Sequence, residues 1–134
     1  MTDMNDILVP ISPGELIDKI TILEIKSARM SDAAKLQNVR TELTLLQQTW
    51  QASAYSAVDI REEWQGLREV NGQLWDIEDE IRDKERDHAF DQQFIELARA
   101  VYVTNDERAS IKRRINVKLG SALVEEKSYR DYKK

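Results

Sequence analysis

Apolar residues recur at intervals of three or four along most of this chain, and this spacing predicts an all-α protein. Capping residues and short polar stretches divide the pattern into segments. The expected helices span about residues 13–30, 32–51, 60–86 and 91–119. Gly120 follows the last of them as an expected C-terminal stop. Together the segments predict a bundle of about four helices.

The first expected helix has the clearest start signal. Ser12 and Glu15 form a capping box around Pro13, in which the Ser12 hydroxyl accepts a hydrogen bond from the Glu15 amide and the Glu15 carboxylate returns one. One face of this helix carries Leu16, Ile20, Leu23 and Met30. Ile22 and Ile25 point nearly the other way. A helix that is apolar on two sides is expected to be central in its bundle or covered by a second chain.

The stretches outside the helices complete a single helical domain over residues 1–134. Residues 1–11 are expected to form an extended arm whose apolar residues dock on the body. These residues are Ile7, Leu8, Val9 and Ile11. The helical bundle covers residues 12–120, and residues 121–134 form a charged tail. No internal repeat or low-complexity linker indicates a second domain.

Composition narrows the chemistry that the chain can carry. Its 134 residues include no cysteine and one histidine, which excludes disulfides, thiolate metal sites and multi-histidine metal centres within one chain. We therefore expect no metal site and no cofactor. The net charge of −5 argues against a nucleic-acid partner.

The start of the chain bears on its location. Residues 1–6 are acidic, and the apolar stretch over residues 7–11 is short and contains Pro10. This is not the form of a signal peptide. No run approaches the roughly 20 apolar residues of a membrane span. We expect a cytoplasmic protein with no membrane span.

Charged and amide side chains fall inside the apolar stripes, at positions where a bundle core is expected. The resulting candidate ligand-binding residues are Glu24 on the first helix, Asn71, Trp75, Glu78 and Arg82 on the third, and Asn105, Arg108, Lys112 and Asn116 on the fourth. Isolated buried charges are too costly to keep. These groups must therefore pair with one another, bind a ligand or reach water.

The charges in this set favour an anionic ligand. Glu24 and Glu78 supply two carboxylates, whereas three cations come from Arg82, Arg108 and Lys112. Guanidinium and amide groups suit the oxygens of a phosphate, a carboxylate or a sugar. The alternative is an ion-pair network that ties the helices together and needs no ligand. Some of the residues would also fit a homodimer interface across which they pair.

Several strings of the sequence resemble an uncharacterised bacterial family of small all-helical proteins. The opening string SPGELIDKITILEIK, at residues 12–26, is specific. Further matching strings lie within residues 71–82, 94–116 and 125–129, so the resemblance covers nearly the whole chain. The strings contain most of the candidate residues named above and also Asp18, Lys19 and Asp106.

The resemblance implies an association with glycosyltransferase and surface-polysaccharide genes, but no established activity. It suggests a role in the assembly of a carbohydrate polymer or lipopolysaccharide, with a glycosyltransferase-type protein as partner. It does not imply a reaction.

Three functions remain open at this point. The first is a non-catalytic binding or accessory module for a small anion or sugar phosphate. The second is an enzyme acting on a sugar-phosphate-like substrate, with Glu78 or Glu24 as general acid or base and nearby cations stabilising a developing anion. The third is a structural oligomerisation module that uses Ile22 and Ile25 as its contact surface.

Overall fold

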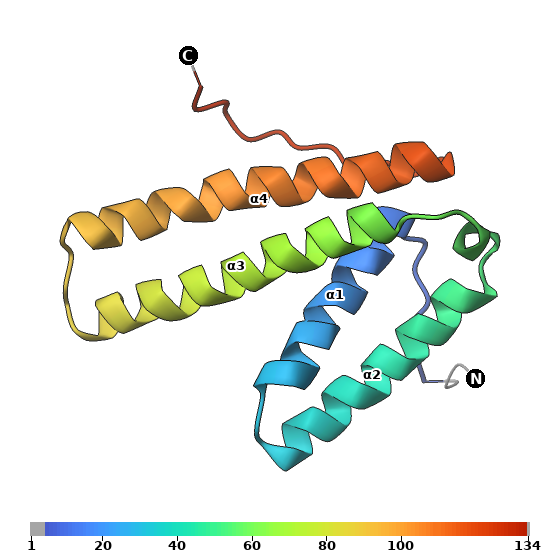
Figure 1. The fold of residues 1–134 in the computed structure, drawn as a ribbon, viewed down its shortest axis with the longest axis horizontal. Helices are drawn as coiled ribbons and strands as arrows, with labels where there is room; N and C mark the ends of the chain where they lie inside the picture. Colours follow the sequence, from blue (N-terminus) through green and yellow to red (C-terminus); the bar gives the residue numbers. More distant parts are fainter. Residues whose placement is uncertain (1–4, 134) are drawn as a thin grey trace.

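Two helical hairpins make up the part of the chain that the computed structural model describes, residues 5–133 (Figure 1). The elements are α1 (Pro13–Arg29), α2 (Ala33–Ala52), the short 3-10 helix η1 (Ala54–Ala57), α3 (Arg61–Arg86) and α4 (Gln92–Leu119). The predicted all-α fold is confirmed, and the helix ends lie within a residue or two of the expected ones.

The starts of α1, α2 and α4 follow from their capping residues, whereas α3 begins after Ile60 without a side-chain cap. The Ser12 hydroxyl accepts a hydrogen bond of 3.1 Å from the Glu15 amide at the start of α1. Asp32 and Asp91 cap α2 and α4 in the same way. α4 ends where Gly120 takes a left-handed backbone with φ of 68°, a conformation that glycine adopts without a steric penalty.

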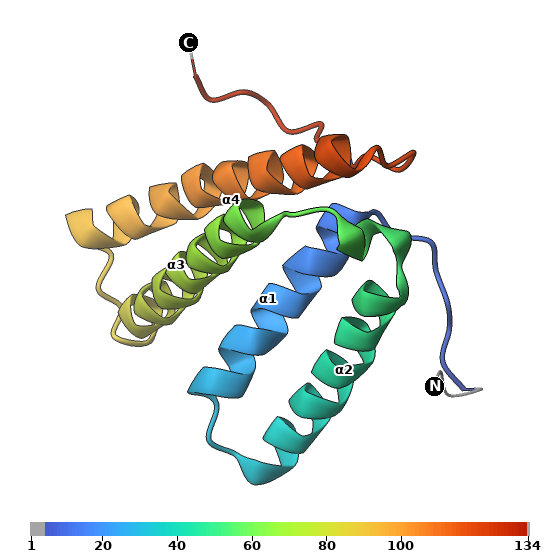
Figure 2. The same cartoon turned by 45° about the vertical axis from the view of Figure 1, so that its right-hand side comes forward.

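α1 is the central helix, because it packs against the other three (Figures 1 and 2). Ile17 and Ile20 of α1 are fully buried, together with Leu67 of α3 and Ile115 of α4. Ile25, on the second apolar side of α1, is only 5% exposed within the single chain. Of the two expectations for a helix that is apolar on both sides, the central position is therefore the one observed.

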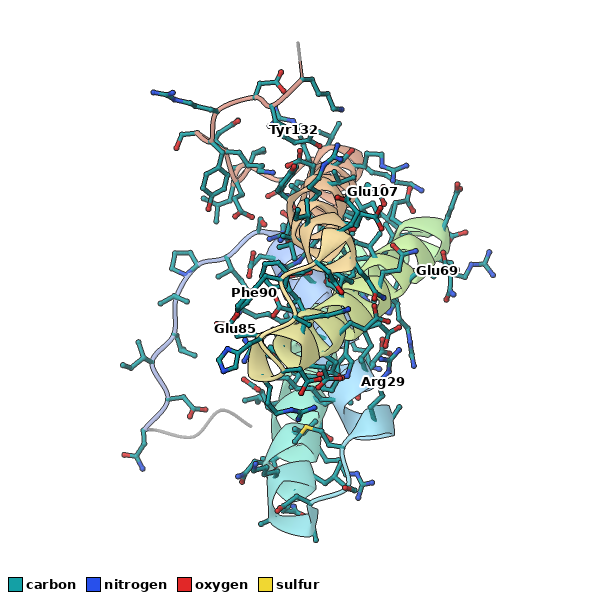
Figure 3. All side chains as sticks on the ribbon, turned by 90° about the vertical axis from the view of Figure 1, so that its left-hand side faces the viewer. Arg29, Glu69, Glu85, Phe90, Glu107 and Tyr132 are labelled. Carbon is teal, nitrogen blue, oxygen red and sulfur yellow. The ribbon has the colours of Figure 1, made fainter. Side chains whose placement is uncertain are left out.

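The N-terminal arm does not dock as expected. Ile7, Leu8 and Val9 keep 90%, 77% and 66% of their surface exposed. In Figure 3 the arm stands away from the helices. The arm borders a groove that the partly buried Leu45 and Leu46 of α2 also line, but its own apolar side chains stay exposed there. Residues 1–4 of the expected arm lie outside the described residues.

The two hairpins differ in length, so that part of the longer one is not covered by the shorter one. α1 and α2 lie against one end of the longer α3–α4 hairpin, whose other end projects beyond them (Figures 1 and 2). Residues 121–133 form no helix and run back alongside α4. No helix in residues 5–133 is both long enough and apolar enough to cross a membrane.

Candidate functional site

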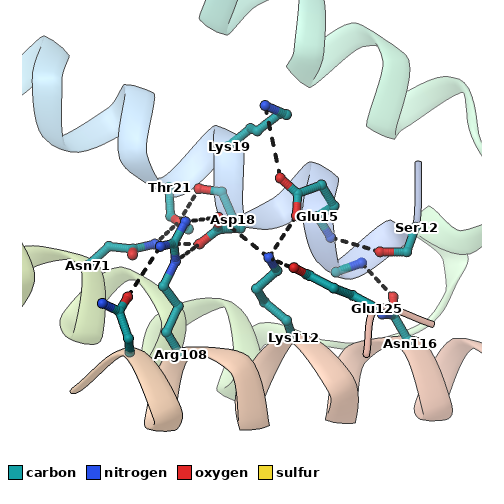
Figure 4. Close-up of polar contacts among 12 residues, drawn as sticks. Ser12, Glu15, Asp18, Lys19, Thr21, Asn71, Arg108, Lys112, Asn116 and Glu125 are labelled. Carbon is teal, nitrogen blue, oxygen red and sulfur yellow. Dashed lines mark hydrogen bonds and ion pairs between the residues drawn. The ribbon is translucent and has the colours of Figure 1, made fainter. Parts of the chain in front are cut away.

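A row of polar side chains on α4 faces α1 (Figure 4). The row consists of Asn105, Arg108, Lys112 and Asn116, whose spacing of three or four residues keeps them on one side of the helix. Lys112 and Asn116 are buried, and the other two are partly buried. The polar cluster that these residues form with α1 is the candidate site.

Asp18 of α1 is the centre of the polar cluster and is only 1% exposed. Arg108 holds it with two bonds, from Nε to Oδ1 at 2.8 Å and from Nη2 to Oδ2 at 2.5 Å. The side-chain amide of Asn71, on α3, donates to Asp18 Oδ1 and to Thr21 Oγ1, both at 3.0 Å. Asp18 therefore joins three helices through one carboxylate.

Lys112 lies one turn further along α4 and binds three carboxylates. Its Nζ is 2.6 Å from Glu15 Oε2, 2.7 Å from Glu125 Oε2 and 4.0 Å from Asp18 Oδ2. The lysine side chain is 10% exposed, whereas that of Glu125 in the tail is 59% exposed. An accessible carboxylate thus reaches a lysine that is itself nearly buried.

Asn116 ties α4 to the first turn of α1. Its Oδ1 accepts a hydrogen bond of 2.7 Å from the amide of Gly14, one of the free N–H groups at the helix start. Glu15, next in the chain, does not complete the capping box as expected. Its carboxylate turns to Lys112 and Lys19 instead, because a charged partner is a stronger attraction than the backbone amide.

Asp18 and Lys112 are both ionised at neutral pH. Burial disfavours the carboxylate form of Asp18, but hydrogen bonds from Arg108 and Asn71 outweigh it, so the pKa of Asp18 lies below its usual range. Burial likewise opposes the charge on Lys112, and its bonds to Glu125 and Glu15 outweigh that effect and raise its pKa. Every charge that α1 and α4 bring together is therefore held by an opposite charge.

The lowered pKa of Asp18 predicts a loss of stability in acid. Because the folded pKa lies below the unfolded value, the ionised carboxylate stabilises the fold above about pH 4, and this stabilisation is lost as the pH falls through the folded pKa. We expect the free energy of unfolding, measured with urea between pH 7 and pH 2.5, to fall less steeply in Asp18→Asn than in the wild type. Parallel curves would show that Asp18 does not carry this pH dependence.

The structure gathers five of the nine predicted site residues and separates the other four. Asn71, Asn105, Arg108, Lys112 and Asn116 lie in the polar cluster. The ones outside it are Glu24, which contacts Trp64 and Arg68, Trp75, which lies beside Arg29, and Glu78 and Arg82, which pair with each other. Glu24 lies on α1 and faces α3 rather than α4, whereas Glu78 and Arg82 lie on the half of α3 that α1 does not cover.

Sequence reasoning missed the carboxylates that hold the cluster together. Asp18 and Glu15 sit on the side of α1 that faces α4, and Glu125 arrives from the tail. Asp18 does belong to the opening string of the family resemblance, which was the available signal. The carboxylates of the cluster are therefore Glu15, Asp18 and Glu125, and not Glu24 and Glu78 as the sequence predicted.

A groove between α4 and the tail opens onto the cluster. Its volume is about 770 Å³, and its walls include Asn105, Arg108 and Lys112 from α4 and Tyr132 from the tail. The tail is held over it by three ion pairs, Glu125 with Lys112, Glu126 with Arg113 and Lys127 with Asp106. The Tyr132 ring also packs on Tyr102, with centroids 4.9 Å apart. The groove thus gives access to the α4 side of the polar cluster, at Asn105, Arg108 and Lys112.

Fold and site together define a small all-α protein with a charged cluster buried between its helices and a groove beside it. In residues 5–133, no group of three or more acidic or histidine side chains is placed to hold a metal ion. The chain belongs to a family whose model, described as a family of unknown function (DUF6165), matches residues 7–132. No significant match to a curated protein or to a solved structure is found.

Proposed function

We propose that the protein is a non-catalytic module that binds a small anion, a phosphate or carboxylate group, at the mouth of the polar cluster. The observation that carries the proposal is the contact between Glu125 and Lys112. A carboxylate from an exposed tail binds a lysine that is 10% exposed, at 2.7 Å. A free anion in the groove would meet the same donor.

Neighbouring donors support the same position. Arg108 uses Nε and Nη2 for Asp18, while its Nη1 is 3.5 Å from Asn105 Oδ1 and its side chain is 30% exposed. Asn105, whose side-chain amide can donate, lines the same groove. A guanidinium, an ammonium and an amide that face one groove are a suitable set for the oxygens of a phosphate.

The charge balance also favours an anion once the tail moves away. Without Glu125, the cluster holds the carboxylates of Glu15 and Asp18 against the cations of Lys19, Arg108 and Lys112. One positive charge is then in excess, counting Lys19, whose side chain is 51% exposed. Glu125 neutralises this excess in the structure and acts as an internal competitor.

A sugar phosphate is the ligand class that we favour. Tyr102 and Tyr132 line the groove beside the cationic donors, and aromatic rings offer an apolar face to a sugar ring. The resemblance to a family linked with glycosyltransferase and surface-polysaccharide genes supports the same class. We propose an accessory role beside a glycosyltransferase-type partner in the cytoplasm, and the absence of cysteine suits a reducing compartment.

The enzymatic alternative has less support from the geometry. Glu24 contacts Arg68 and Trp64 on the far side of α1 from the groove, and Glu78 pairs with Arg82 on the surface. Asp18, the carboxylate inside the cluster, has a lowered pKa and is a poor proton donor at neutral pH. No described carboxylate of the cluster is left without a cationic partner.

Removing the internal competitor should expose the anion site. We expect Glu125→Gln to bind inorganic phosphate, glucose 1-phosphate or UDP-glucose about tenfold more tightly than the wild type, because a charge-assisted contact no longer has to be broken first. Isothermal titration calorimetry measures this change, with glucose as the uncharged comparison.

A neighbouring tail carboxylate supplies the matched control. Glu126→Gln removes an ion pair with Arg113, whose side chain is 55% exposed, and should leave the affinities unchanged. Failure of all three anions to bind either protein would refute the proposed function. Equal gains in both variants would assign the effect to general charge and not to Lys112.

A further inference from the structure

The α3–α4 hairpin leaves part of its inner face uncovered. Arg29, the last residue of α1, reaches Asp76 with an ion pair of 2.6 Å and lies over the Trp75 ring. Beyond this point α3 and α4 continue together without a third helix, as Figures 1 and 2 show. In Figure 3, which looks along the projecting hairpin, Glu85 and Phe90 lie at its near end.

The rows of residues that face α1 continue past the end of α1. On α4 the row of the polar cluster is extended by Val101, Ala98 and Phe94, and on α3 the row of Asn71 is extended by Trp75, Glu78 and Arg82. We call these six residues the open seam. Each extension keeps the spacing of three or four residues that holds side chains on one helix face.

Burial falls sharply where the cover ends. Asn71 and Lys112, under α1, are 5% and 8% exposed. In the open seam, Trp75, Phe94, Ala98 and Val101 are only partly buried, and Arg82 is exposed. Two helices cannot bury both of their inner stripes against each other, and a bundle needs a third or fourth helix to do so.

The open seam carries its own charge complement. Glu78 Oε2 is 3.2 Å from Arg82 Nε, four residues later, and their side chains are 47% and 79% exposed. A face that bears one charge of each sign is complementary to itself after a two-fold rotation. In such an arrangement, Glu78 of each copy meets Arg82 of the other.

We propose that the open seam is the contact surface for a second copy of this chain. Two projecting hairpins then pack into a four-helix bundle, with the partly buried apolar residues at its centre and two reciprocal Glu78–Arg82 pairs across the two-fold axis. This surface differs from the one first expected at Ile22 and Ile25, of which Ile25 is buried inside the chain and Ile22 is partly buried. The proposal is independent of the anion site, which lies in the groove between α4 and the tail.

Charge reversal tests the reciprocal pairing. Sedimentation equilibrium should show a dimer for the wild type, with dissociation constants raised about tenfold or more in Glu78→Arg and in Arg82→Glu, because each single change places like charges opposite each other. The double variant, Glu78→Arg with Arg82→Glu, restores opposite charges and should restore the dimer.

A charge reversal outside the open seam completes the test. Asp79→Arg lies on the same helix but on its exposed side, and should leave the dimer intact. Circular dichroism of each variant verifies that the helices are retained. A wild-type protein that stays monomeric at its highest soluble concentration would overturn the proposal, as would a dimer that the single reversals do not weaken.

Discussion

Asp18→Ala should lower the free energy of unfolding by about 3–5 kcal/mol. The change removes a carboxylate that is 1% exposed and leaves Arg108 and the Asn71 amide without their main partner. Breaking a buried pair from one side is costly, because the Asn71 amide is buried and the Arg108 guanidinium is only 30% exposed. Urea denaturation at pH 7, monitored by far-ultraviolet circular dichroism, measures the loss.

The pair between Arg29 and Asp76 provides a matched control. It has a similar bond length, 2.6 Å, but the two side chains are 39% and 61% exposed. Asp76→Ala should therefore cost no more than about 1 kcal/mol. Similar losses in both variants would contradict the view that burial makes Asp18 the main polar link between the helices.

Gly14→Ala is the second change with a large expected effect. It should lower the free energy of unfolding by about 1–3 kcal/mol. Alanine normally stabilises a helix relative to glycine, so the usual expectation for such a change is a gain in stability. At this position, however, an added Cβ would lie 2.5 Å from the Lys112 carbonyl oxygen and 3.0 Å from Asn116 Oδ1. The backbones of α1 and α4 would have to separate, which weakens the bond from the Gly14 amide to Asn116.

Gly72→Ala tests the same substitution without the clash. Its added Cβ would meet only the end of the flexible Arg29 side chain, at 3.7 Å. We expect a gain of up to about 1 kcal/mol from the better helix former. The two variants should therefore shift the urea midpoint in opposite directions. A stabilising Gly14→Ala would mean that the close contact between α1 and α4 is not needed for the fold.

Most of the fold could be predicted from the sequence because helices are local structures. The cap at Ser12 and the stop at Gly120 each act within one turn, so their signals lie next to one another in the chain. The arm was the exception. Its apolar residues indicated docking, but a short apolar stretch does not show which surface it packs on, and the structure leaves these side chains exposed.

The polar cluster could be predicted only in part, since a helical wheel shows which side of a helix a residue is on but not its partner. The α4 row was recognised by its spacing. Its main partner, Asp18, was not recognised, because the position of an acidic residue on a helix that is apolar on two sides does not show which neighbouring helix it faces. Glu78 and Arg82 showed the same spacing, yet they lie in the open seam because α1 ends before reaching them.

The sequence by itself determined four helices, their ends and the faces that carry unusual charges, since all of these depend on residues within a few positions of each other. Only the tertiary structure decided that α1 is central, that Asp18 joins Arg108 to Asn71, and that Glu125 returns from the tail to Lys112. Those contacts span 53 residues between Asp18 and Asn71 and 90 between Asp18 and Arg108. Such pairs form only when the crossing of the two hairpins and the length of α1 are fixed by packing.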